Sequence, residues 1–78
     1  MEEILKLVIE NLVDNKESIS IKNTEEDGIV KFEVQVPQEE MGKVIGKQGK
    51  IARSIRTLMK SVASKEHKKV DVEFVESN

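Results

Sequence analysis

Apolar residues at the start of the chain recur at the spacing of an amphipathic helix. Residues 2–14 carry five of them on one arc and charged side chains on the opposite arc. The apolar arc holds Ile4, Leu5, Val8, Ile9 and Leu12. Asp14 and Asn15 are poor helix formers, so we expect the helix to end there. Apolar and polar residues then alternate over residues 18–22, which predicts a short strand, and the polar residues 23–28, ending in Asp-Gly, predict a turn.

The second half of the chain continues with strand and helix patterns in turn. Residues 30–36 alternate most clearly, which predicts a strand that Pro37 closes. Residues 39–44 predict a short helix that stops at Gly46, and residues 48–64 predict a long amphipathic helix. The apolar arc of the long helix spans roughly 100° and holds Ile51, Ile55, Leu58, Met59 and Val62. Residues 70–74 alternate again and predict the last strand.

The order of these elements, α-β-β-α-α-β, predicts an α+β fold with a three-stranded sheet and helices packed on one face. A length of 78 residues, of which 37% are hydrophobic, fits one domain over residues 1–78 with a small core. The chain has no cysteine, which excludes a disulfide scaffold and a zinc knuckle. It has no apolar run of membrane-spanning length and no basic leader, so we expect a cytoplasmic protein without membrane contact.

The net charge of −2 hides a strong asymmetry along the chain. Residues 1–40 contain eleven acidic and four basic side chains, whereas residues 41–78 contain four acidic and nine basic ones. Six of those bases and no acid lie between Lys43 and Lys60. A chain with this distribution can meet a polyanion on one side despite its acidic balance, although charges also segregate by chance.

The most informative stretch is Gly46-Lys47-Gln48-Gly49, between the two predicted helices of the second half. Glycine can adopt positive φ and lets another backbone approach closely. The long helix behind the loop presents unpaired N–H groups and a partial positive charge, which suit a phosphate. Lys47 adds a mobile positive charge where a sugar-phosphate backbone would lie. A tight helix-to-helix turn also favours glycine, so the two glycines alone are a weak signal.

With its flanks, this loop resembles the signature of the KH domain, whose G-x-x-G loop clamps the backbone of single-stranded RNA or DNA. The resemblance is carried by Val44-Ile45-Gly46-Lys47-Gln48-Gly49-Lys50-Ile51. The order of elements is similar to the bacterial, type II arrangement. Residues 12–15, 41–51 and 55–58 resemble the KhpA family of small single-KH proteins, over essentially the whole chain. The resemblance implies a type II KH fold, with a three-stranded mixed sheet and three helices on one face.

By position, the resemblance implies a backbone clamp at Gly46, Lys47, Gln48 and Gly49. It implies a base-binding groove lined by Val44, Ile45, Lys50, Ile51, Ala52 and Ile55, with Val34 and Val36 across it at the edge of the second strand. Basic side chains beside this site are Lys43, Arg53, Arg56 and Lys60. Ile51, Ile55 and Val34 are also good core candidates. A solvated helix face is the simpler interpretation of Arg53, Arg56 and Lys60.

The family resemblance implies single-stranded RNA as the ligand and a role as an RNA chaperone or regulator. It also implies self-association, pairing with a larger KH protein (KhpB), or both. Phe32 and Phe74 are the only aromatic residues and both fall at in-facing strand positions, so base stacking on aromatic rings is largely excluded. Affinity would then come from phosphate contacts, base-edge hydrogen bonds and an aliphatic groove for about four nucleotides. The alternative is a KH-fold interaction module that dimerises or docks a protein, with little RNA binding of its own.

The residues do not indicate an enzyme, a cofactor, a metal site or a small-molecule substrate. His67 is the sole histidine and lies beside two lysines in a predicted exposed turn. The serines of the long helix have no base nearby, and the acidic residues 25–27 lack the ligand spacing of a calcium loop. We therefore expect no catalytic residues.

Overall fold

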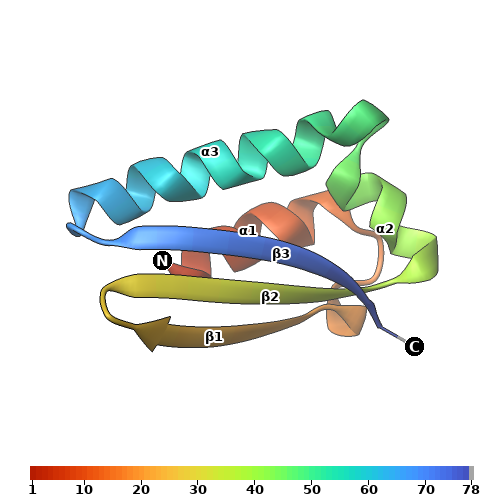
Figure 1. Ribbon diagram of the computed structural model, residues 1–78. Helices are drawn as coiled ribbons and strands as arrows, with labels where there is room; N and C mark the ends of the chain where they lie inside the picture. The colour runs from red at the N-terminus through yellow and green to blue at the C-terminus, as the bar shows by residue number, and fades with distance from the viewer. Residues whose placement is uncertain (78) are drawn as a thin grey trace.

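The computed structural model describes residues 1–77 and contains three helices and three strands (Figure 1). They are α1 (Glu2–Leu12), β1 (Ser20–Glu26), β2 (Ile29–Pro37), α2 (Gln38–Ile45), α3 (Lys50–Lys65) and β3 (Lys69–Ser77). Two 3₁₀ turns, Lys16–Ser18 and Lys47–Gly49, join α1 to β1 and α2 to α3. The predicted order α-β-β-α-α-β is confirmed.

The three strands form one mixed sheet in the order β1-β2-β3. β1 pairs with β2 antiparallel through a tight hairpin, and β3 pairs with β2 parallel after the α2–α3 crossover. The helices cover one face of this sheet, and α3 runs along β3 (Figure 1). The predicted three-stranded mixed sheet with helices on one face is therefore confirmed.

The core lies between the sheet and the helices, and alternation along β2 creates it. Val30, Phe32, Val34 and Val36 point inward and are buried, whereas the residues between them face away from the helices. The helices contribute Leu5, Ile9, Val44, Ile55 and Met59, and β3 contributes Val72. On the outer face Lys31 and Glu73, on neighbouring strands, form an exposed ion pair at 3.3 Å.

Several predicted boundaries are wrong. α1 ends at Leu12 rather than at Asp14, β1 begins at Ser20 rather than at residue 18, and β3 extends to Ser77. β1 continues through residues 23–26, which we expected in the turn, and the turn is confined to Asp27 and Gly28. Pairing with β2 supplies hydrogen-bond partners along this polar stretch and outweighs its composition. The long helix begins at Lys50 rather than at Gln48, because Gln48 and Gly49 both have positive φ.

Candidate nucleic-acid interface

The loop Gly46–Gly49 makes a sharp turn between α2 and α3. Gly46 ends α2, its N–H donating to the carbonyl of Gly42 at 2.8 Å, and it adopts φ +71° and ψ −174°. Gln48 (φ +54°) and Gly49 (φ +76°) follow in the left-handed region. This turn leaves the side chains of Lys47 and Gln48 exposed at its tip.

Gly46 is also fixed by packing. A Cβ at this position would lie 2.4 Å from Cγ1 and 2.6 Å from Cδ1 of Ile51. Ile51 is half-buried and packs against the core, so its side chain connects the loop to the interior. Gly49 differs, because no atom lies within 4 Å of a Cβ built there. Ile51 therefore anchors the C-terminal end of the loop to the core.

The N-terminus of α3 opens directly onto this loop. Its N-cap residue is Gly49, which has no side chain to accept a hydrogen bond from the first-turn N–H groups. The first turn contains no acidic residue, and the exposed Lys47 and Lys50 flank it. The N–H of Lys50 donates to the carbonyl of Lys47. The N–H groups that follow it, together with the positive end of the helix dipole, face a site with positive charge, an arrangement that suits an anion.

Arg53, Arg56 and Lys60 follow along α3 and are exposed. Arg56 and Lys60 lie beside β3. Nε of Arg56 donates to the carbonyl of Val72 at 3.0 Å, and the guanidinium lies 5.6 Å from the centroid of the Phe74 ring. A cation above an aromatic face is attracted by the ring quadrupole. Arg56 is exposed, as a solvated helix face predicts, but its guanidinium is also held in place at the seam between α3 and β3.

The expected position of Val34 and Val36 on a groove edge is wrong. β2 is the central strand, both of its edges are paired, and the two valines are completely buried in the core. The free edge of the sheet beside α3 belongs to β3 instead. Local alternation does not encode the order of strands in a sheet. The sequence pattern therefore could not show that β3, rather than β2, forms the edge beside α3.

The remaining groove candidates divide by exposure. Val44, Ala52 and Ile55 are buried beneath the surface, which is what the core interpretation of Ile55 predicted. Ile45, at the end of α2, exposes 36% of its surface, and Ile51 is half-buried. The apolar surface next to the loop therefore consists of Ile45 and Ile51.

Lys43 has a different surrounding from the one expected. Its ammonium pairs with Asp14 and, at 2.7 Å, with Glu40, a carboxylate that is only 4% exposed. Glu40 also accepts from the backbone N–H of Asn15 at 2.7 Å, which joins α2 to the segment after α1. The hydrogen bond from Lys43, followed by that from Asn15, lowers the pKa of Glu40, and the bonds to Asp14 and then Glu40 raise the pKa of Lys43. Lys43 thus fastens α2 in place and is not a free charge beside the loop.

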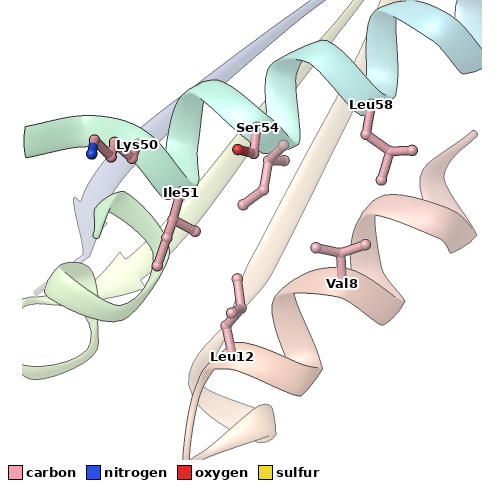
Figure 2. A pocket seen from close by; sticks show the side chains of 7 residues that line it. Val8, Leu12, Lys50, Ile51, Ser54 and Leu58 are labelled. Atoms are coloured by element: carbon pink, nitrogen blue, oxygen red, sulfur yellow. The ribbon is translucent and has the colours of Figure 1, made fainter. Parts of the chain in front are cut away.

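An apolar groove of about 300 Å³ separates α1 from α3. Its lining consists of Val8, Leu12, Lys50, Ile51, Ser54, Ile55 and Leu58. Figure 2 shows Val8 and Leu12 pointing toward the side chains of α3 across this groove. Ile4 and Leu7 continue the apolar surface of α1 into solvent, and Leu7 is 62% exposed. We call the surface formed by Ile4, Leu7, Val8, Leu12, Ile51 and Leu58 the α1/α3 apolar face. The sequence pattern placed all of these except Leu7 on the apolar arcs of their helices.

The other residues with reactive side chains lie at the surface. His67 is exposed, and so are the three serines of α3. Among residues 1–77, no three histidine, cysteine or acidic side chains gather as metal ligands do. No helix in this described part of the chain has the length and apolar character needed to cross a membrane.

Comparison with known proteins gives consistent matches. A family profile described as the KH domain of KhpA and KhpB matches residues 2–74. The chain is 43% identical over 76 residues to the RNA-binding protein KhpA of Listeria monocytogenes, a match that covers 97% of this chain and 100% of the relative. It is 43% identical over 75 residues to the RNA-binding protein KhpA of Clostridium perfringens, with 96% and 100% coverage. The RNA-binding protein KhpA of Chlamydia trachomatis is 38% identical over 76 residues, 97% of each chain.

Proposed function

The chain belongs to the KhpA/KhpB family of KH domains, and from this premise we propose that it binds single-stranded RNA at the Gly46–Gly49 loop. The loop clamps the sugar-phosphate backbone of about four nucleotides, as G-x-x-G loops of KH domains do. The observation that carries this proposal is the uncapped N-terminus of α3 behind the loop, flanked by exposed lysines. Residues 1–78 act in this proposal as one KH domain in the cytoplasm, as an RNA chaperone or regulator and without catalysis.

Different groups around the loop contact the phosphates and the bases of the RNA. Lys47, Gln48 and the first N–H groups of α3 contact phosphates, whereas Ile45 and Ile51 offer an aliphatic surface to the bases. Phe32 is completely buried and Arg56 lies over Phe74, which supports a mechanism without aromatic stacking. Affinity then depends mainly on phosphate contacts, so binding is modest and its sequence preference is weak.

The direct test replaces both residues at the tip of the loop with acids. Lys47→Asp with Gln48→Asp repels phosphate, and acids near the N-terminus of α3 remain compatible with the helix dipole. We expect affinity for a short single-stranded RNA to fall about tenfold or more, with unchanged thermal unfolding. The matched control is Lys16→Asp with Gln38→Asp, which makes the same charge change at two exposed positions away from the loop. Equal affinity of the two double variants would remove the loop from the binding site.

The dependence of binding on salt separates the two classes of function. For a single strand, log K falls by roughly 0.7 per unit of log salt concentration for each phosphate that the protein neutralises. An RNA-binding domain that neutralises a few phosphates therefore shows a clear negative slope. A flat response would favour the alternative, a KH-fold module that docks proteins.

We also propose that the protein forms a homodimer through the α1/α3 apolar face. Of the seven residues that line the groove beneath it, only Lys50 is charged, although 36% of the chain is charged, and depletion of charge is typical of interface cores. The face carries both an exposed apolar ridge, formed by Ile4 and Leu7 of α1, and an apolar groove between α1 and α3. In a two-fold dimer each copy presents the same patch, so the ridge of one copy can enter the groove of the other. This self-complementary shape favours a second copy of the chain as the occupant, ahead of a larger KH protein.

The test of this interface is Leu7→Glu. Leu7 is largely exposed, so the substitution costs the isolated chain little, whereas a dimer would have to bury the new carboxylate. We expect light scattering over a range of concentrations to show dimers for the wild type and monomers for the variant. Ile29→Glu, at an exposed apolar residue at one end of β2, is the control and should remain dimeric. A wild type that is monomeric throughout would refute the dimer and leave the RNA-binding proposal untouched.

A further inference from the structure

Three lysines gather at the end of α3 that lies farthest from the Gly46–Gly49 loop. Lys60, Lys68 and Lys69, together with Val70, line a surface pocket of about 250 Å³. In Figure 1 this is the end where α3 turns into β3, opposite the end where α2 meets α3. We call it the lysine pocket.

The backbone holds the lysine pocket in shape. The chain leaves α3 through two hydrogen bonds, from His67 N–H to the carbonyl of Ser64 at 3.0 Å and from Lys68 N–H to that of Ala63 at 2.9 Å. This is the Schellman pattern of a helix end, with His67 in the left-handed position (φ +58°) that glycine usually occupies. The N–H of Lys69 then donates to the carbonyl of Gly28 at 3.1 Å. These hydrogen bonds fix the backbone of Lys68 and Lys69, from which the two side chains extend.

The pocket carries more positive charge than its surroundings neutralise. Lys68 pairs with Glu25 at 3.0 Å, whereas neither Lys60 nor Lys69 forms an ion pair with any residue of the described chain, residues 1–77. Cations are favourable near the C-terminus of a helix, which offers a purely structural explanation. Lys65 already occupies the last turn of α3, however, and Lys69 belongs to β3. The ammonium groups of Lys60 and Lys69 are therefore not needed to stabilise the C-terminus of α3.

The lysine pocket continues the positive surface that begins at the loop. Arg53, Arg56 and Lys60 lie on successive turns of α3, the latter two beside β3, and Arg56 is fixed there by its bond to Val72. At 1.5 Å per residue, Lys60 lies about 15 Å along the helix from Lys50. A strand clamped at the loop and running along the seam between α3 and β3 therefore reaches the pocket after passing Arg56.

We propose that the lysine pocket is a second phosphate-binding subsite, which holds single-stranded RNA extending beyond the nucleotides clamped at the loop. This inference rests on the proposed RNA-binding function, and it extends the RNA-binding site from the loop to the lysine pocket. Ammonium groups bind phosphate as point charges, so this subsite adds affinity without reading the bases. It makes long single strands bind better than short ones.

The test compares the double variant Lys60→Ala with Lys69→Ala on a tetranucleotide and on an RNA of about twelve nucleotides. Lys68 stays in place so that its pair with Glu25 is kept. We expect unchanged affinity for the tetranucleotide and an affinity about three- to tenfold lower for the longer RNA. The salt slope for the longer RNA should decrease by about 1.4, because two fewer phosphates are neutralised.

The control for charge is Lys16→Ala with Lys22→Ala, which removes two exposed lysines away from the seam. If the longer RNA binds the lysine-pocket variant as tightly as it binds this control, the subsite does not exist. If binding of the tetranucleotide weakens equally, the lysines belong to the loop site and the inference is also refuted. A failure of the proposed loop site gives a different result: the tetranucleotide would still bind the variant Lys47→Asp with Gln48→Asp.

Discussion

Replacing Gly46 with alanine should destabilise the protein far more than a surface substitution does. The backbone at φ +71° and ψ −174° lies in a region that is essentially restricted to glycine, at a cost of about 1–3 kcal/mol for other residues. The new Cβ would also lie 2.4 Å from Cγ1 of Ile51, and overpacking of this kind costs about 1–3 kcal/mol. Together the two effects reach about 2–6 kcal/mol, a large part of the roughly 4–12 kcal/mol typical of a domain this size.

Urea unfolding followed by circular dichroism measures this loss, with Gly49→Ala as the matched control. Gly49 also has positive φ, but a Cβ there meets no atom within 4 Å, so the expected cost is about 1–2 kcal/mol. Combining Gly46→Ala with Ile51→Ala removes the two closest clashing atoms, and the double variant should lose less than the sum of the single variants. Equal losses at the two glycines, or strict additivity with Ile51→Ala, would refute the packing argument.

Two further predictions concern stability. Because its pKa is lowered in the folded protein, Glu40 contributes stability above the pKa of the unfolded chain, and this contribution is lost as pH falls through the lower folded value. The advantage of the wild type over Glu40→Gln in thermal unfolding should therefore be present at pH 7 and disappear in strong acid; a pH-independent difference would contradict the assignment. His67→Gly should raise stability by up to about 1 kcal/mol, since the left-handed strain outweighs the added chain entropy of glycine, and a lower unfolding temperature would contradict this.

The elements of this fold were predictable because their patterns are local. The alternation of Val30, Phe32, Val34 and Val36 and the helical spacing in residues 2–14 and 48–64 need no knowledge of distant partners. Pairing between strands decides where a strand ends when the local pattern does not. Residues 23–26 join a strand because β2 offers them hydrogen bonds, against their polar composition.

The candidate site was predictable at the loop and less so around it. Two glycines and two polar residues before a long helix predict a sharp turn with exposed polar side chains at residues 46–49, and the structure has that turn. The strand beside α3 depends on the order of the sheet, which no local pattern records, and Val34 and Val36 were misplaced for that reason. The partners of Lys43 come from residues 14 and 40, and only the folded chain brings all three together.

The central claim, that RNA is held at the junction of α2 and α3, is tested most directly by an NMR titration of backbone amides with a short single-stranded RNA. We predict that the largest saturable shifts fall on Gly46–Arg53, with smaller shifts at Arg56 and along the edge of β3. Shifts concentrated instead on the outer face of the sheet, around Lys31 and Glu73, or no saturable shifts at all, would contradict the claim.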